Sequence, residues 1–441
     1  MKSISKFFSH NFPLIIILVT SFILLSYKID KPFWGHHDFN NSFYGIMGRN
    51  LNRYGSVATK LGQVTNSGYT KNFLYHTHHP PLLIWSLAIS YRLFGVSERS
   101  TRLIPVIFSL LTLWFFYKFI ELILNRSTAF IAVVFWIITP LFLYFGKMAV
   151  HEILVLCFMM LAFWRYHLWL KEKSKNNLLM VYFALLGGCM SGWPGFYSPI
   201  IIILLDLWTQ RKLRKETLVM MIIPVLVFIF QLVHNLVLTG SVVGGNFWQA
   251  FALRSSSIEP ALYLKREIPW ALAYYSKPLV LLATIYLVIS LWQRKLSPMV
   301  LGFLALGLIH PIFFREAVFR HDYLIYYLLP FFSLAAAQCL NIFFHSNKMV
   351  LTTAFMIIVY FSLKSTISFT SALLFSDRYR ESVQIGKYIH SGSSFKDRIL
   401  VVLPKETQSD FENWHISFYS DRKLKIVRTN VKNPQVHFNY E

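Results

Sequence analysis

Charged side chains are scarce in this chain of 441 residues, and the scarcity excludes most soluble folds. Only 14% of the residues are Asp, Glu, Lys or Arg, whereas about 25% is usual for a soluble domain. Because 55% of the residues are hydrophobic and long apolar runs recur along the chain, the sequence predicts a polytopic helical membrane protein.

Acidic residues are especially few, with 20 Asp and Glu against 43 Lys and Arg and a net charge of +23. Two interpretations fit this excess. Basic residues gather in the cytoplasmic loops of membrane proteins, and a basic surface also suits an anionic substrate or an anionic lipid. We expect both to apply. Nucleic-acid binding is not expected, because the positive charge is spread over membrane loops.

Cysteine is also scarce, and the first apolar run lacks a cleavage site. Cys157, Cys189 and Cys339 each lie within an apolar run, which indicates small core residues and neither a disulfide framework nor a cysteine metal site. Lys2 and Lys6 precede the first apolar run, and no small-residue cleavage site follows it. This pattern is typical of an uncleaved signal anchor with its N-terminus in the cytoplasm.

Apolar runs of membrane length predict an all-α bundle of about eleven transmembrane helices, at ~20 residues for each span. Basic clusters follow alternate runs, so that they all lie on one side of the membrane, as the positive-inside rule requires. The expected spans are 12–27, 103–120, 127–146, 153–170, 178–192, 195–209, 217–238, 278–293, 298–314, 323–343 and 349–370.

Two segments of the first outer loop (residues 28–102) are expected to lie along the membrane surface as juxtamembrane helices. A helix over 81–95 would be only ~22 Å long, which is too short for a ~30 Å hydrocarbon core. Over 39–54, apolar side chains recur at helical spacing with polar ones between them, and Gly55 is the expected C-cap. The loop 239–278 is long enough for a further surface helix.

Membrane character ends at about residue 375. The stretch RESVQIGKYI predicts a helix, RILVVLP predicts a strand, and HISFYSDRKLKIVRT predicts a helix or turn that leads into a strand. We therefore expect a membrane domain at 1–374 and a small extracytoplasmic α/β domain at 375–441.

Two carboxylates stand out because they lie at the predicted outer ends of spans. Asp38 immediately precedes the first surface helix, where an Asp often serves as the N-cap, but it could also act as a base. Glu152 lies in an apolar stretch after the third span, where a carboxylate is costly unless it is solvated or paired. Its structural alternative is a pair with Lys147 or His151.

Histidines are concentrated in the predicted outer loops, at positions 36, 37, 78, 79 and 151. The candidate metal ligands are Asp38, Glu152 and His151. Carboxylate oxygens favour magnesium or manganese, whereas imidazole favours zinc or its neighbours. Neither an HxxxH nor an HExxH spacing occurs, so most of these histidines also fit an interpretation as polar loop residues.

Basic residues on the predicted outer side oppose the topology rule and therefore indicate an anionic ligand. Arg315 and Arg320 lie there in FFREAVFRHDY, and Arg99 and Arg102 lie in VSERSTRL. Arginine suits bidentate contacts to phosphate. For the latter pair, a salt bridge with Glu98 is the structural alternative.

At these residues the chain resembles the GT-C superfamily of membrane glycosyltransferases, in particular the group of protein O-mannosyltransferases and lipid A aminoarabinose transferases. The likeness covers most of residues 10–375 and is strongest over 34–200. Asp38 before a surface helix, His79 before Pro-Pro-Leu, and Glu152 after the third span follow the order of the family's motifs. His79 stands where the family carries Lys, and Glu152 where it carries Asp.

Three further segments add to the resemblance. The run ERSTRL (98–103) resembles an acidic-then-basic pattern before the second span, and SGWPGF (191–196) resembles a Gly-Pro turn. HDYLIYYLLP (321–330) resembles a late aromatic-Pro helix start and adds His321 to the candidate donor-binding residues. The order of these segments, together with the topology, is more specific than any one of them.

The resemblance implies a glycosyltransferase that takes a sugar from a polyprenyl-phosphate donor to an acceptor hydroxyl with inversion. Asp38 would deprotonate the acceptor, and one carboxylate is enough because a phosphate departs without a general acid. The charge that develops on the leaving phosphate would be stabilised by Arg315, Arg320, His79 or a metal held partly by Glu152. The expected partners are the donor, membrane lipids and a glycolipid, glycan or protein acceptor. The expected location is a bacterial plasma membrane, with the active site on the extracytoplasmic side.

Two other classes of protein fit part of this pattern. A transporter or flippase for an anionic lipid-linked substrate explains the spans and the basic outer residues. Transporters, however, place ionisable residues mid-membrane at broken helices, whereas the mid-span regions here are nearly free of charge. A non-enzymatic membrane scaffold that displays the C-terminal domain would carry a degenerate outer loop, and this loop is not degenerate.

Overall fold

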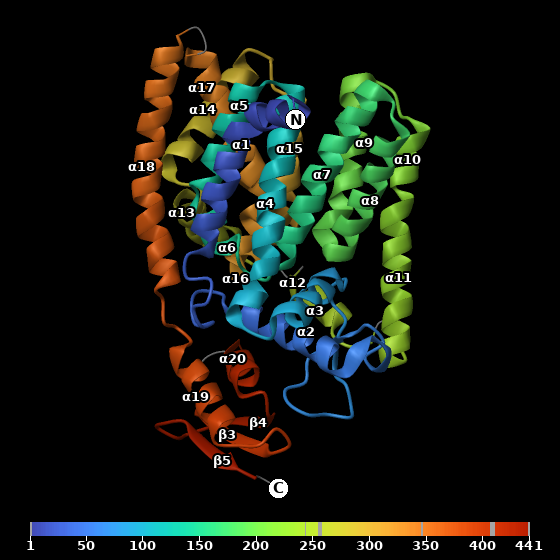
Figure 1. Ribbon diagram of the computed structural model, residues 1–441, viewed down its shortest axis with the longest axis vertical. Helices are drawn as coiled ribbons and strands as arrows, with labels where there is room; N and C mark the ends of the chain where they lie inside the picture. The colour runs from blue at the N-terminus through green and yellow to red at the C-terminus, as the bar shows by residue number, and fades with distance from the viewer. Residues whose placement is uncertain (1, 243, 255–257, 345–346, 406–410, 440–441) are drawn as a thin grey trace.

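Long apolar helices form a bundle, two helices lie across one end of it, and a small α/β unit follows beyond them (Figure 1). The computed structural model describes residues 2–242, 244–254, 258–344, 347–405 and 411–439. The helices of the bundle are α1 (Lys2–Ser26), α4 (Glu98–Ile123), α5 (Arg126–Ile137), α6 (Pro140–Phe145), α7 (His151–Glu172), α8 (Lys175–Ser191), α9 (Tyr197–Gln210), α10 (Lys215–Met220), α11 (Ile222–Thr239), α14 (Lys277–Trp292), α15 (Pro298–Phe313), α17 (Leu329–Phe344) and α18 (Lys348–Leu374).

The number of membrane spans differs from the expected number. In the described ranges, five helical stretches are long and apolar enough to cross a membrane. The number rises to six if the bent pair of α13 (Pro260–Tyr274) and α14 counts as one span. The expected count of about eleven, at ~20 residues for each span, is therefore not confirmed. One reason is breakage: the expected span 127–146 stops at Ile137 and resumes at Pro140, because proline has no N–H to continue a helix.

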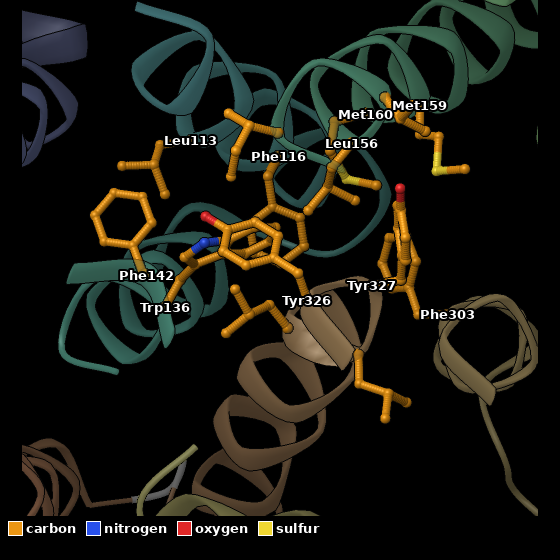
Figure 2. Packing of buried hydrophobic residues seen from close by; sticks show 14 of the residues in the cluster. Leu113, Phe116, Trp136, Phe142, Leu156, Met159, Met160, Phe303, Tyr326 and Tyr327 are labelled. Atoms are coloured by element: carbon orange, nitrogen blue, oxygen red, sulfur yellow. The ribbon is translucent and has the colours of Figure 1, made fainter. Parts of the chain in front are cut away.

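Aromatic and aliphatic side chains fill the middle of the bundle (Figure 2). Tyr326 and Tyr327 point from the segment before α17 between Phe116 of α4, the α7 side chains and Phe303 of α15 (Figure 2). All of these side chains are buried. The three cysteines are also buried and unbonded, which agrees with their expected role as small core residues. This packed core fixes the ends of the helices that carry the polar residues described below.

The two surface helices are α2 (Phe39–Ala58) and α3 (Leu82–Phe94), as the sequence predicted. They approach closely because Gly48 has no side chain: a Cβ there would lie 2.8 Å from the Cβ of Leu87. Gly55 is not the C-cap, since it interrupts α2 with a φ of +79° and the helix resumes as far as Ala58. A short antiparallel pair, β1 (Gln63–Val64) with β2 (Tyr75–His76), connects the two helices.

Shorter elements complete the end of the bundle near α2 and α3. The expected surface helix in the loop 239–278 is two helices, α12 and α13, and the Gly-Pro turn forms a 3-10 helix. These elements are η1 (Trp193–Phe196), α12 (Phe247–Arg254), α13 (Pro260–Tyr274), α16 (Arg315–Arg320) and η2 (Asp322–Leu328).

The chain ends in a small α/β unit, as the sequence predicted for this region. It comprises α19 (Arg380–Ser391), β3 (Arg398–Pro404), α20 (Phe411–Ser420), β4 (Lys423–Thr429) and β5 (Gln435–Phe438). The strand order is β4-β3-β5, with β3 parallel to β4 and antiparallel to β5. Apolar side chains of β3, α19 and α20 form a separate small core.

The α/β unit is fastened to α2. Phe418 of α20 packs on Phe33, with ring centroids 5.2 Å apart. Arg49 of α2 donates a hydrogen bond to the carbonyl oxygen of Phe418 at 2.8 Å and forms an ion pair with Asp421 at 3.1 Å. The α2 helix is therefore held between the bundle and the α/β unit (Figure 1).

Candidate active site

A cavity of about 600 Å³ opens where the surface helices meet the ends of α7, α9, α11, α12 and α15. Its walls differ in character. One part carries imidazole, carboxylate, phenol and guanidinium groups, and the other is almost wholly apolar. The polar groups belong to Tyr44, His78, His79, His151, Glu152, Arg254, His310, His321 and Tyr323.

The imidazoles at the polar end are stacked on one another. The rings of His79 and His151 are nearly parallel, with centroids 4.2 Å apart, and His78 meets His79 edge-on at the same centroid distance. Tyr44 of α2 covers the other ring edge of His151 at 4.9 Å. The loop that carries His78 is anchored by the indole N–H of Trp193, which donates to the His78 carbonyl oxygen at 2.7 Å.

Hydrogen bonds fix the tautomers of two of these imidazoles. Nδ1 of His151 donates to the carbonyl oxygen of Ser191 at 2.6 Å, so in the neutral ring Nε2 carries the lone pair. Arg254 donates from Nη1 to Nε2 of His79 at 3.3 Å, so the proton of neutral His79 sits on Nδ1. That Nδ1–H is buried and has no hydrogen-bond partner among the described residues.

Several other ring nitrogens at the cavity are also buried without a hydrogen-bond partner among the described residues. They are both nitrogens of His78, Nε2 of His151, Nδ1 of His310 and Nδ1 of His321. Burial lowers the pKa of His78, His79 and His321 well below the ordinary value of 6.5, with the charge of Arg254 acting in the same direction. These rings are therefore neutral at neutral pH, and an anion that accepts their N–H groups would raise each pKa again.

Glu152 lies in the first turn of α7 and faces the cavity. Its side chain is only 6% exposed, and it forms no ion pair with any described residue. Lys147, a partner considered from the sequence, donates instead to the carbonyl oxygen of Tyr27. A negative charge in the first turn is favoured by the helix dipole of α7.

Asp38 is buried behind the surface of the cavity and does not line it. Its Oδ2 accepts from the backbone N–H of Gly35 and its Oδ1 from the amide of Asn41, both at 2.8 Å. Arg102 lies 3.3 Å from Oδ1. Asp38 stands at the N-cap position of α2, but its carboxylate makes no capping bond to that helix. The cavity therefore brings Glu152 and His151 together without Asp38.

The arginines considered from the sequence take different places. Arg102 holds Asp38 and also donates to the carbonyl oxygens of Ile29 and Lys31, while its guanidinium lies over a phenylalanine ring. Arg99 is exposed, and Arg315 is half-buried. The side chain of Arg320 is 62% exposed and pairs with Glu316 at 2.6 Å. In their place the cavity is lined by an arginine that the sequence reading did not select, Arg254.

A second polar cluster borders this cavity. Nε2 of His36 lies 2.7 Å from Oδ2 of Asp322, and Nε2 of His37 lies 3.0 Å from Oδ1. The ring of His37 meets the cavity residues Tyr323 and His321, at centroid distances of 5.4 and 6.1 Å. Sequence reasoning missed Asp322, although an acidic residue at the start of an apolar run was the signal for it.

These features define a polytopic membrane protein with a cavity that is polar in one part and apolar in the other. Residues 78–234 match the family model described as dolichyl-phosphate-mannose-protein mannosyltransferase. No curated protein matches the chain by sequence.

Solved structures share the fold over nearly the whole chain. ArnT from Cupriavidus metallidurans bound to undecaprenyl phosphate superposes with a TM-score of 0.67 at 13% identity, over 94% of this chain and 86% of ArnT. The oligosaccharyltransferase AglB from Archaeoglobus fulgidus, in complex with an inhibitory peptide and a dolichol phosphate, gives 0.62 at 12% identity, over 95% of this chain and 64% of AglB. The Archaeoglobus fulgidus oligosaccharyltransferase in complex with Zn and sulfate superposes with a TM-score of 0.62 at 14% identity, over 93% of this chain and 62% of that chain. The chain shares the fold of ArnT and AglB, and residues 78–234 match the mannosyltransferase family model, in agreement with the polytopic all-α membrane fold that the sequence predicted.

Proposed function

We propose that this protein is a glycosyltransferase that moves a sugar from a polyprenyl-phosphate donor to an acceptor hydroxyl. The observation that carries the proposal is the two-part cavity, which matches a ligand with an anionic head and a long apolar tail. The match to the mannosyltransferase family model and the shared fold support it.

The phosphate of the donor would lie at the polar end, beside Arg254 and the stacked imidazoles. Arg254 supplies a fixed positive charge, and charge-assisted hydrogen bonds to phosphate are about twice as strong as neutral ones. His79 offers its unpartnered Nδ1–H from the loop before α3. His78 and His321 add ring nitrogens without partners from two other segments of the described chain. Arg315 and Arg320, selected from the sequence, remain predictions outside this cavity.

The polyprenyl tail would leave along the apolar wall. Ile200 of α9 and Val225 and Phe228 of α11 line the cavity, and each of these residues is about half exposed. An apolar wall of this kind would let an isoprenoid chain pass from the cavity towards the bilayer without crossing a polar barrier. Trp193 and Trp248 stand at the same wall.

Glu152 is the carboxylate that the cavity offers to the acceptor. In the proposed step the acceptor oxygen bonds to the anomeric carbon while the bond from that carbon to the phosphate oxygen breaks. The hydroxyl proton passes to Glu152, and the polyprenyl phosphate leaves with the electron pair. A phosphate needs no general acid to leave, which explains why one carboxylate suffices. Attack opposite the leaving group inverts the anomeric carbon.

In this proposal Asp38 forms an ion pair with Arg102. The pair fixes the start of α2 and thereby the position of Tyr44. The sequence-based role of Asp38 as base remains a prediction, and the experiment below compares it with Glu152. Removing one member of a buried ion pair costs about 3–5 kcal/mol, so Asp38→Asn would also disturb the fold of the loop. A divalent metal stays part of the proposal and is considered separately.

The proposal includes a location on the extracytoplasmic face of a bacterial plasma membrane. The basic connection α9–α10 and the start of α18 lie at the end of the bundle opposite α2 and α3 (Figure 1). Because basic loops stay in the cytoplasm, the cavity end would face outward. A glycolipid, a glycan or a protein hydroxyl would reach it from that side.

The experiment is a transfer assay with the purified full chain, polyprenyl-phosphate sugars and cell-envelope acceptors, read as release of free polyprenyl phosphate. Loss of a general base lowers kcat about 100- to 10,000-fold, so Glu152→Gln should do so while donor binding is retained. Glu316→Gln, which removes a carboxylate that pairs with Arg320 and does not line the cavity, is the matched control. A full rate in Glu152→Gln would refute its role as the base, and a lost rate in Asp38→Asn with donor binding retained would then assign the base to Asp38. Net movement of the intact donor lipid without cleavage would instead identify a flippase.

A further inference from the structure

Two imidazoles and one carboxylate converge beside the cavity, at His36, His37 and Asp322. Their ligand atoms all lie within 4.8 Å of one another. Two imidazoles and a carboxylate form a common protein site for divalent transition metals, because such ions accept nitrogen and oxygen ligands together. The cluster differs from the ligand set expected from the sequence, which comprised Asp38, Glu152 and His151.

The backbone is bent so that two consecutive side chains face one carboxylate. In an extended chain the side chains of neighbouring residues point to opposite sides. His37 instead has a φ of +55°, in the left-handed region, and its ring meets that of His36 at a centroid distance of 4.2 Å. For a residue other than glycine this conformation costs roughly 1–2 kcal/mol. Such strain persists where the surrounding structure requires it, often at functional sites.

The charges around the cluster are unbalanced. The carboxylate of Asp322 is fully buried, and its polar contacts among the described residues are imidazoles and a neutral hydroxyl: His36, His37 and Tyr274. Glu267 is close enough to interact electrostatically with Asp322, and neither of its buried oxygens has a hydrogen-bond partner among the described residues. Arg266 approaches Glu267 only at 3.8 Å.

One face of α13 presents these groups to the cluster. Glu267, Trp270 and Tyr274 recur at positions i, i+3 and i+7, so they share a side of the helix. The ring of Trp270 stacks on His36, with centroids 5.7 Å apart and an angle of 10° between the rings, and Tyr274 donates to Asp322 at 2.8 Å. Hydrogen bonds and packing of this kind orient the ligands of metal ions in proteins.

We propose that His36, His37 and Asp322 bind one divalent transition-metal ion, with Glu267 supplying further negative charge. Imidazole nitrogens favour zinc, cobalt or iron over magnesium and calcium, which prefer all-oxygen sites. The ion would join the first outer loop to the start of η2, and so fix His321 and Tyr323 at the cavity and Asp38 next to His37. Metal binding here does not depend on the proposed sugar transfer.

The experiment uses the full chain in detergent, stripped of metal with a chelator and titrated with Co²⁺, whose visible absorption reports its ligands. We expect saturation at one equivalent in the wild type and its loss in Asp322→Asn. His36→Cys keeps a ligand but replaces nitrogen by sulfur, so it should bind Co²⁺ with a new sulfur-to-metal charge-transfer band. Tyr274→Phe removes only the hydroxyl that orients Asp322, and it should weaken binding by about 10- to 100-fold.

The control is His78→Gln, which changes a cavity imidazole outside the cluster. It should leave Co²⁺ binding unchanged. The proposal is overturned if the wild type takes up no Co²⁺, if binding survives undiminished in Asp322→Asn, or if it is lost in His78→Gln. Because the His36→Cys spectrum is a gained signal in a folded protein, a merely destabilised variant cannot produce it. The cobalt titration is read without sugar transfer, so either proposal can fail while the other stands.

Discussion

Arg254 offers the sharpest test of how the cavity binds its donor. It is the arginine that lines the cavity, and it donates to His79, whose other ring nitrogen is buried without a partner among the described residues. Replacing Arg254→Met keeps most of the apolar stem and removes the positive charge. We expect weaker binding of polyprenyl phosphate, because the phosphate loses the positive charge of Arg254 and the hydrogen bond that orients His79 is lost with it.

The magnitude follows from the chemistry of the contact. Hydrogen bonds that involve a charged group contribute about 1.5–3 kcal/mol. Since 1.4 kcal/mol corresponds to a factor of ten in Kd, Arg254→Met should raise the Kd for polyprenyl phosphate by roughly 10- to 100-fold. Polyprenol, the same chain without phosphate, should bind the wild type and the variant equally, because the apolar wall of the cavity is unchanged.

The assay is equilibrium binding of both lipids to purified protein in detergent. Arg320→Met is the matched control, because Arg320 is exposed, pairs with Glu316 and does not line the cavity. It should change neither Kd by more than about 2-fold, as expected for an exposed ion pair worth under ~1 kcal/mol. An equal loss in both variants, or an equal loss for both lipids, would refute the placement of the phosphate.

Three further predictions concern stability. Burial lowers the pKa of His415 to about 3, so its contribution to folding is present above pH ~6.5 and is lost as the pH falls towards 3. The free energy of unfolding of the wild type should therefore fall more steeply below pH 6.5 than that of His415→Gln, by up to about 1.4 kcal/mol per pH unit, and Tm should follow it. Parallel curves of Tm against pH would contradict this. Gly48→Ala should lower the free energy of unfolding by about 1–3 kcal/mol, and with it Tm, because the new Cβ would press on α3. Gly302→Ala should not, since the atom nearest to its Cβ would lie at 3.4 Å. Asp421→Asn leaves Arg49 buried without its charge partner, so limited proteolysis should release the α/β unit faster, and an unchanged cleavage rate would argue against this fastening.

Local patterns predicted most of the elements because their signals lie within a few residues. The surface helix α2 and the α/β unit were predicted from local residue patterns, and α3 was predicted from the short length of its apolar run. The fate of Arg320 could also have been foreseen, since Glu316 lies one helical turn earlier, at the spacing that favours such pairs. The count of spans was harder, because proline breaks and short helices interrupt long apolar runs.

The composition of the site could not be predicted in the same way. Arg254 and His79 are 175 positions apart, and His36 and Asp322 are 286 positions apart. No periodicity relates such residues; only the packing of the bundle brings them together. The sequence identified most of the histidines and Glu152 but did not show which of them share a wall, nor that Asp38 is held by Arg102 behind it.

Because α20 packs on α2, α2 can reach its final packing only after the C-terminal segment has been synthesised. His415 of α20 bonds to Ser42 of α2 across 373 positions of chain, at 3.0 Å. During synthesis the first outer loop emerges long before α20 exists, so its helix must wait for most of the translated polypeptide before it acquires its outer support. A premature stop in the last segment would thus leave the membrane helices intact and still remove the outer support of α2, which carries Tyr44 at the cavity.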